Sequence, residues 1–96
     1  MNPFGLIADF LFRASTDPSC GPFHISLYLS LILARSRQGN QDPFSISRSE
    51  MMEGSKIQSY ATYHKCMREL VASGYIRYVP SYHPVIASLI WVLPLV

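Results

Sequence analysis

Charged side chains are scarce in this chain. They make up 15% of the 96 residues, whereas globular domains average about 25%. The hydrophobic share of 49% is enough for a core and too high for a disordered segment. So few charges leave much of the surface uncharged. We therefore expect a second copy of the chain, or another partner, to cover part of it.

Cysteine is also rare, and the two residues, Cys20 and Cys66, lie far apart in the sequence. Neither belongs to a Cys-x-x-Cys motif or lies at metal-ligand spacing from a histidine, which argues against a zinc site. His24 precedes an apolar run and is expected to start a helix rather than to bind a metal. Two unpaired thiols are typical of a reducing compartment. We therefore expect a cytoplasmic protein without a metal or a cofactor.

Long hydrophobic runs are missing. The two longest apolar stretches, residues 23–34 and 85–96, are much shorter than the about 20 residues that span a bilayer. The N-terminal segment is apolar but has neither the basic start nor the small-residue cleavage site of a secretory signal. The sequence therefore predicts a soluble protein, and a membrane is not among its expected partners.

The length and charge of the chain set loose limits on its organisation. Residues 1–96 are predicted to form a single domain, because globular domains usually contain about 100–200 residues. The formal net charge is +2, which by itself says little about nucleic acid. The basic excess, however, lies between residues 35 and 77, the segment that contains two closely spaced predicted helices.

The first predicted helix covers residues 3–15. Phe4, Ile7 and Leu11 lie at helical spacing and are predicted to form its buried stripe. Phe10 falls on another face of the same helix. This stripe therefore does not account for every large apolar residue of the segment.

Residues 23–38 match two patterns. Leucines alternate with other residues over positions 27–33, which is typical of a strand. The run ends with Arg35, Arg37 and then Gly39, and basic residues followed by a glycine are typical of a helix C-terminus. The length also favours a helix over a strand. We therefore predict a helix that is apolar on most sides and central to the core.

A short extended segment at residues 44–46 is predicted to precede a short helix at residues 48–53. Ser47 is the expected N-cap of this helix. Glu50 follows three residues later, which is the spacing of a capping box. Gly54 is expected to end the helix.

A longer helix at residues 60–73 follows, with Ser59 as its expected N-cap and Gly74 as its expected C-terminal stop. Its apolar residues recur at helical spacing. They are Tyr63, Cys66, Met67, Leu70 and Val71. The first four are assigned to the core, so Cys66 is expected to be an inert core thiol.

Residues 75–79 and 85–93 have the composition of two strands around a loop at residues 80–84, which predicts a hairpin. The predicted order is helix, short strand, short helix, longer helix and hairpin. This is the order of a winged helix-turn-helix, an α+β, mainly helical fold with a three-helix core and a β-hairpin wing, here with an extra N-terminal helical segment. Its parts are an N-terminal extension (1–22), the first helices and the turn (23–58), the recognition helix (59–74) and the wing (75–93).

Residues 59–76 resemble the recognition helix of bacterial winged-helix regulators. The shared features are a Ser/Thr-rich start, Leu70, three variable residues, and Gly74-Tyr75-Ile76 leading into the wing. Four segments are similar to a family of small DNA-binding proteins of bacterial conjugative and mobilisable elements: 24–28, 43–48, 61–66 and 74–78. This resemblance extends over roughly residues 24–90. It implies sequence-specific binding of duplex DNA by a transcriptional regulator, or by an accessory factor in transfer, excision or replication.

The wing tip departs from the family. A basic or glycine-containing stretch is expected there, whereas residues 85–89 have no basic side chain. Either the wing contacts DNA mainly through Ser81, Tyr82 and His83, or part of it serves contacts with protein.

The candidate DNA contacts lie on and around the longer helix. Since its apolar stripe faces the core, His64, Lys65 and Arg68 face outward and are best placed for the major groove. Phosphate contacts are expected nearby. The complete set is Arg48, Lys56, Ser59, Tyr60, Thr62, His64, Lys65, Arg68, Arg77, Tyr82 and His83. The alternative for each of them is an ordinary solvated surface residue.

Both ends of the chain hold more large apolar residues than one wing needs. They are Phe4, Leu6, Ile7, Phe10, Leu11 and Phe12 at one end, and Leu89, Ile90, Trp91, Val92, Leu93, Leu95 and Val96 at the other. We expect the two ends to pack together and against a second chain in a homodimer, because monomers seldom expose large apolar patches. The alternative is that both ends complete the core of a monomer.

A competing function is a protein-interaction or dimerisation module that keeps the winged-helix fold without contacting DNA. The apolar wing favours it, whereas the outward face with Lys65 and Arg68 argues against it. Serine, histidine and aspartate occur at no spacing that identifies an activated nucleophile. We therefore expect no enzymatic activity and no catalytic residue.

Overall fold

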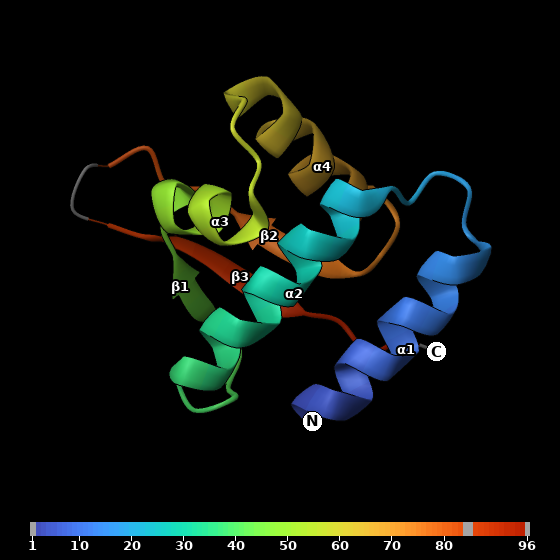
Figure 1. Cartoon of the computed structure of the whole chain (residues 1–96). Helices are drawn as coiled ribbons and strands as arrows, with labels where there is room; N and C mark the ends of the chain where they lie inside the picture. Colours follow the sequence, from blue (N-terminus) through green and yellow to red (C-terminus); the bar gives the residue numbers. More distant parts are fainter. Residues whose placement is uncertain (1, 84–85, 96) are drawn as a thin grey trace.

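Four helices and a three-stranded antiparallel sheet make up the part of the chain that the computed structural model describes, residues 2–83 and 86–95 (Figure 1). In chain order they are α1 (Pro3–Thr16), α2 (Pro22–Arg37), β1 (Phe44–Ile46), α3 (Arg48–Ser55), α4 (Tyr60–Ala72), β2 (Ile76–Val79) and β3 (Ser88–Val92). The fold is α+β and mainly helical, which confirms the predicted class. In these described ranges, no helix is long and apolar enough to cross a membrane.

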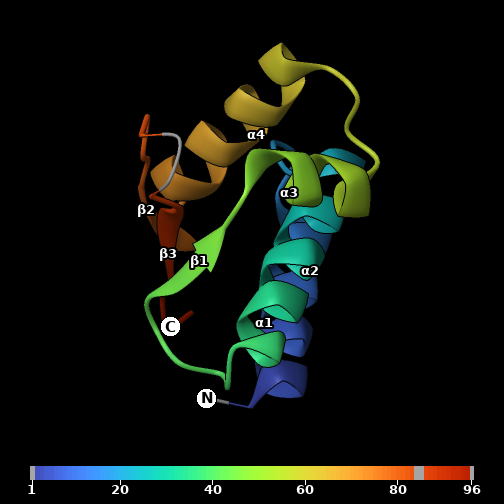
Figure 2. The same ribbon diagram turned by 90° about the vertical axis from the view of Figure 1, so that its left-hand side faces the viewer.

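The helix α2 lies at the centre of the molecule, where it packs against α1, α3, α4 and β1. Figure 2 shows α1 and α2 side by side, with the strands on the other side of the molecule. Leu27, Tyr28 and Leu31 of α2 are fully buried. The prediction of a central helix is therefore confirmed. The alternating pattern in its sequence reflects burial on several sides rather than a strand.

Serine side chains begin α3 and α4, as predicted. The hydroxyl of Ser47 accepts a hydrogen bond from the backbone N–H of Glu50 (3.2 Å). The hydroxyl of Ser59 accepts one from the backbone N–H of Thr62 (3.3 Å). These bonds satisfy donors that the first turn of a helix leaves unpaired. At the other end of α4, Gly74 has a φ of 80° and stops the helix, also as predicted.

The prediction that Gly54 ends α3 is wrong. The helix continues to Ser55, and Lys56 takes the left-handed conformation at its end (φ 63°). Gly54 instead permits a close approach to α2, because a Cβ atom there would lie 3.2 Å from the hydroxyl oxygen of Ser30. Beside this contact, the hydroxyl of Ser26 donates to the carbonyl oxygen of Ser55 (2.8 Å). The glycine thus sets the spacing of two helices.

The buried stripe of α1 differs from the predicted one. The residues that face the core are Leu6, Phe10 and Ala14. Of the predicted stripe, Ile7 is partly buried, whereas Leu11 is exposed and Phe4 is 80% exposed. Large apolar residues also occupy exposed positions of this helix, at Phe4, Leu11 and Phe12, so the spacing of apolar residues did not single out the buried face.

An aromatic cluster selects the buried face of α1. The ring of Phe10 stacks on the ring of Tyr28 in α2, with centroids 3.8 Å apart and an interplanar angle of 7°. It also meets the ring of Tyr75 edge-on, at 5.0 Å. Such ring pairs add to the free energy gained by burial. Phe10 therefore faces inward and turns Phe4 and Leu11 toward solvent.

In the sheet, β3 lies between β1 and β2, and both pairings are antiparallel. Ile90 of β3 is opposite Phe44 of β1 and Tyr78 of β2. The predicted hairpin is therefore present, and the segment at residues 44–46 joins it as a third strand. The second strand of this hairpin, β3, covers Ser88–Val92 and is shorter than the predicted 85–93. Residue 85 lies outside the described residues.

A buried ion pair joins the end of α2 to the sheet. Arg35 is 3% exposed, and its guanidinium donates to both carboxylate oxygens of Asp42 (Nε to Oδ1 3.2 Å, Nη2 to Oδ2 3.0 Å). The same carboxylate accepts a hydrogen bond from the backbone N–H of Val92 in β3 (3.1 Å). Because an unpaired buried charge is costly, this pair favours one arrangement of α2, the following loop and β3.

Candidate nucleic-acid interface

An open groove of about 910 Å³ lies between the start of α3, the exposed face of α4 and the loop that joins β2 to β3. The residues that line it are Ile46, Ser47, Arg48, Ser49, Tyr60, His64, Met67, Arg68, Tyr78, Pro80, Ser81, Tyr82, His83, Ile86, Ala87 and Ser88. Two of these lining residues are arginines and two are histidines, and none of them is acidic. The charge of the groove is therefore positive.

The helix α4 forms one wall of the groove. Tyr60, His64 and Arg68 are spaced four residues apart, so they lie along one face of the helix. The adjacent face is buried as predicted, and Met67 at its border also reaches the groove lining. This buried face consists of Tyr63, Cys66, Met67 and Leu70, with Val71 exposed at the edge. The amphipathic pattern of this helix thus sets which side chains reach the groove.

The first residues of α3 and α4 are in contact. The guanidinium carbon of Arg48 lies 4.3 Å from the centroid of the Tyr60 ring. A cation over an aromatic face is a favourable arrangement. It ties the N-terminal ends of the two helices together. It also holds at the groove wall a planar set of N–H donors, which suit phosphate oxygens and base edges.

The loop after β2 forms the opposite wall. The backbone N–H of Ser81 donates to the hydroxyl of Ser88 (3.0 Å), and this bond closes the base of the loop. The backbone N–H of His83 in turn donates to the hydroxyl of Ser81 (3.3 Å). Between them, the side chain of Tyr82 is 94% exposed. The loop is thus fixed at its base and presents an aromatic side chain to solvent.

Six of the eleven candidate contacts from the sequence line this groove: Arg48, Tyr60, His64, Arg68, Tyr82 and His83. They come from α3, α4 and the loop, which are separate segments of the sequence. The structure therefore brings together the part of the candidate set that is centred on the exposed face of α4.

The other five candidates lie outside the lining of the groove: Lys56, Ser59, Thr62, Lys65 and Arg77. Lys65 is exposed on α4, beside the stripe that faces the groove. The hydroxyl of Ser59 is engaged in the N-cap bond of α4. Along β2, Arg77 alternates with Tyr78, so it lies on the opposite face of the sheet. There its guanidinium carbon is 4.9 Å from the ring centroid of Trp91.

The groove also has four serines that the candidate set lacks: Ser47, Ser49, Ser81 and Ser88. Ser47 was expected only as a helix cap, whereas Ser81 was named as a possible DNA contact of the wing loop but was left out of the candidate set. Hydroxyls are common partners of phosphate oxygens. Their convergence depends on the pairing of β1 with β3, which sequence periodicity does not reveal. The only sequence feature that indicated a role for these serines was their frequency just after β1 and around the β2–β3 loop.

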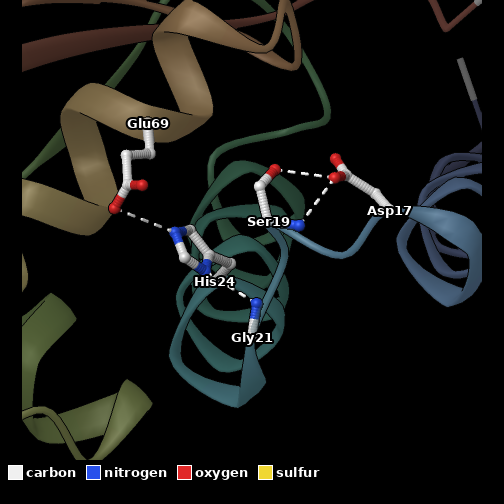
Figure 3. A network of polar contacts seen from close by, with 5 residues as sticks. All are labelled: Asp17, Ser19, Gly21, His24 and Glu69. Carbon is white, nitrogen blue, oxygen red and sulfur yellow. Dashed lines mark hydrogen bonds and ion pairs between the residues drawn. The ribbon is translucent and has the colours of Figure 1, made fainter.

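A second polar cluster joins α2 to α4 (Figure 3). Nδ1 of His24 accepts a hydrogen bond from the backbone N–H of Gly21 (2.9 Å), and Nε2 lies 3.4 Å from Oε1 of Glu69. Next to it, Asp17 accepts two hydrogen bonds from Ser19, which lower the pKa of its carboxyl. His24 therefore lies in the first turn of α2, in the helix-start role predicted for it, and its ring bonds to the N-cap residue Gly21.

Burial raises the pKa of both thiols, Cys20 and Cys66, so both stay protonated at neutral pH. Across residues 2–83 and 86–95, no group of three or more His, Cys, Asp or Glu side chains could hold a metal ion. Comparisons of the chain with protein-family models, curated proteins and solved structures found no match. Its function therefore has to be inferred from its own groove and surface.

Proposed function

We propose that this chain is a winged helix-turn-helix protein that binds duplex DNA sequence-specifically and catalyses no reaction. In this proposal α2, α3 and α4 are the three-helix core, α4 is the recognition helix, and β2 and β3 are the wing. The order of the elements and the strand order β1-β3-β2 support it. The helix α1 is an addition to this core.

The character of the groove is the observation that carries the proposal. Its lining combines two arginines and two histidines with hydroxyl groups and has no acidic side chain. DNA is a dense polyanion, so a surface that binds it must be positive over its contact area. In contrast, acidic side chains elsewhere in the chain, such as Glu53 on α3, do not line the groove. Two of the eight Lys and Arg residues, Arg48 and Arg68, thus line one groove without an acidic lining residue, although the net charge is only +2.

The positions of the side chains suggest a division of roles. His64 and Arg68 lie on the exposed face of α4 and are proposed to contact base edges in the major groove. Arg48 and Tyr60 lie together at the N-terminal ends of α3 and α4 and are proposed to contact phosphates. Phosphates are also favoured there because helix N-termini attract anions.

The salt dependence of DNA binding tests the proposal. Binding of the chain to a random-sequence duplex is expected to weaken with a slope of a few units in log affinity against log salt. Selection of bound sites from a random DNA pool is then expected to yield a defined sequence. Failure to bind duplex DNA at low salt would contradict the proposal. It would favour the alternative function, a protein-interaction module with the same fold.

The resemblance to proteins of conjugative and mobilisable elements suggests the process. We propose that the chain acts as a transcriptional regulator or accessory factor of a mobile genetic element. A selected site that occurs upstream of an element gene supports regulation. A selected site at an element end or transfer origin supports an accessory role.

We further propose that the chain forms a homodimer through α1. Ile90 and Val92 of the apolar C-terminal segment are buried in the core, so they are not free for a partner. On α1, however, Phe4 and Phe12 are 80% and 77% exposed. The only charged residues of α1 are Asp9 and Arg13, so two such faces can meet without repulsion. Figure 1 shows α1 on the right and the groove-forming loop on the left, so this interface leaves the groove open.

Light scattering tests the dimer. The wild-type chain is expected to have the mass of a dimer at tens of micromolar, and Phe12→Glu that of a monomer, because a carboxylate would be buried at the interface. Leu33→Glu is the matched control, since Leu33 is an exposed apolar residue on α2. This control is expected to remain dimeric. A monomeric wild-type mass would contradict the proposal.

A further inference from the structure

Tyr82 and Ile86, here called the loop tip, are two exposed, largely apolar residues in the described part of the β2–β3 loop. Tyr82 is 94% exposed and Ile86 is 62% exposed. Among the described residues of the loop, 80–83 and 86–87, His83 is the only one with an ionisable side chain other than the tyrosine. The described part of this loop has no Lys or Arg, so its phosphate contacts are limited to hydrogen-bond donors such as the Ser81 hydroxyl, and its most exposed large side chains are left for another contact.

This apolar tip belongs to the same groove as the arginines. Tyr82 and Ile86 lie on the loop wall, and Arg48 and Arg68 lie on the helical walls. The bond from the Ser81 N–H to the Ser88 hydroxyl fixes the base of the loop (3.0 Å). A duplex held by the helical walls would therefore meet an aromatic and a branched aliphatic side chain at the loop.

We propose, as an extension of the DNA-binding function above, that the loop inserts Tyr82, supported by Ile86, between two base pairs and bends the duplex. Apolar side chains inserted at a base step unstack it and produce bends of about 20–90°. The aromatic ring replaces part of the lost stacking with its own. The preferred DNA target is therefore a duplex with a base step that unstacks at low cost.

This mechanism also predicts which DNA is preferred. Pyrimidine–purine steps such as TA and CA/TG are the most easily kinked. A preferred duplex places such a step beside the segment that α4 contacts. Sequence selectivity then arises partly at a position where the protein makes no hydrogen bond to a base, because the cost of opening differs between steps.

A protein partner is a less suitable occupant for the tip. The tip faces a groove with two arginines and no acidic lining residue, and this positive charge complements a polyanion. The loop residues and the exposed face of α4 also line the same groove. If the tip instead contacts a second copy of the chain, replacing Tyr82 will change the mass of the protein and leave the shape of bound DNA unaltered.

Fluorescence energy transfer between the two ends of a duplex of about 30 base pairs measures the bend. The probe contains several TA steps, with 2-aminopurine next to one of them. Saturation with the wild-type chain is expected to raise the transfer efficiency and the 2-aminopurine emission. With Tyr82→Ala, the rise in transfer efficiency and the rise in 2-aminopurine emission both disappear. The affinity for the duplex falls by no more than about tenfold, because the variant loses the stacking of the ring on the bases but no longer has to open the base step. Tyr82→Phe retains both signals.

Two controls separate the outcomes. Tyr82 is almost fully exposed, so its replacement is expected to leave the melting temperature unchanged. Arg68→Ala is expected to weaken binding, but its saturated complex is still bent. The inference is overturned if wild-type chain binds without changing the transfer efficiency, or if Tyr82→Ala bends the duplex equally. Both results leave the DNA-binding proposal intact, whereas absence of any wild-type binding overturns both.

Discussion

Asp42→Ala is expected to lower the free energy of unfolding by about 3–5 kcal/mol. The substitution leaves the guanidinium of Arg35, which is 3% exposed, without its carboxylate partner. It also removes the acceptor of the Val92 N–H. A domain has only about 5–15 kcal/mol of stability in total, so much of it is lost. Thermal and urea denaturation followed by circular dichroism measure the loss, with Tm expected to fall by at least about 12 °C.

Two further variants isolate the cause of this loss. Glu53→Ala removes an exposed carboxylate from α3 and is expected to change stability by no more than about 0.5 kcal/mol. The double variant Arg35→Met/Asp42→Ala is expected to recover part of the loss, because no unpaired charge remains buried. If Asp42→Ala stays within about 1 kcal/mol of the wild type, the ion pair does not have the proposed structural role.

The boundaries of α3 and α4 were largely predictable because their signals are local. Ser47, Ser59 and Gly74 act on backbone groups within the same turn of a helix, so their roles can be inferred from the sequence alone. Gly54 shows the limit of such rules. Its significance is the contact with Ser30 of α2, and no local pattern contains that contact. A glycine near a helix end can serve either purpose.

Non-local packing explains the two largest differences from the predictions. The buried face of α1 depends on the stack of Phe10 with Tyr28, two residues on different helices. Arg35 is placed in the last turn of α2, where a basic residue commonly interacts with the helix dipole. Its role as a buried ion pair depends on Asp42 after the turn and on the arrival of β3. Neither contact follows from periodicity.

The part of the candidate interface that lies on α4 was predictable from the sequence, whereas the parts that lie on other elements were less so. The spacing of Tyr60, His64 and Arg68 identifies the exposed face of α4, because the apolar residues between them must face the core. The contributions of Ser81 and Ser88 depend on the base of the hairpin. Lys65 is exposed on the same helix but does not line the groove, so exposure alone did not identify which basic residues of α4 line it.

The double variant Arg48→Ala/Arg68→Ala is expected to bind duplex DNA at least about thirtyfold more weakly than wild type, if each arginine contributes about 1–3 kcal/mol. It removes both arginines from the groove lining. The slope of log affinity against log salt is expected to decrease by about one unit for each arginine that contacts a phosphate. Fluorescence anisotropy with a labelled duplex at several salt concentrations gives both quantities.

Single variants show whether the groove or the net charge is responsible. Arg37→Ala removes one exposed positive charge from the end of α2, outside the groove, and is expected to leave affinity nearly unchanged. Lys65→Ala removes one from α4 beside the groove and is expected to have a smaller effect than Arg68→Ala. Equal effects of all three single variants would mean that only the total charge matters. In that case α4 would not be a recognition helix, because a helix in the major groove holds each side chain against particular bases.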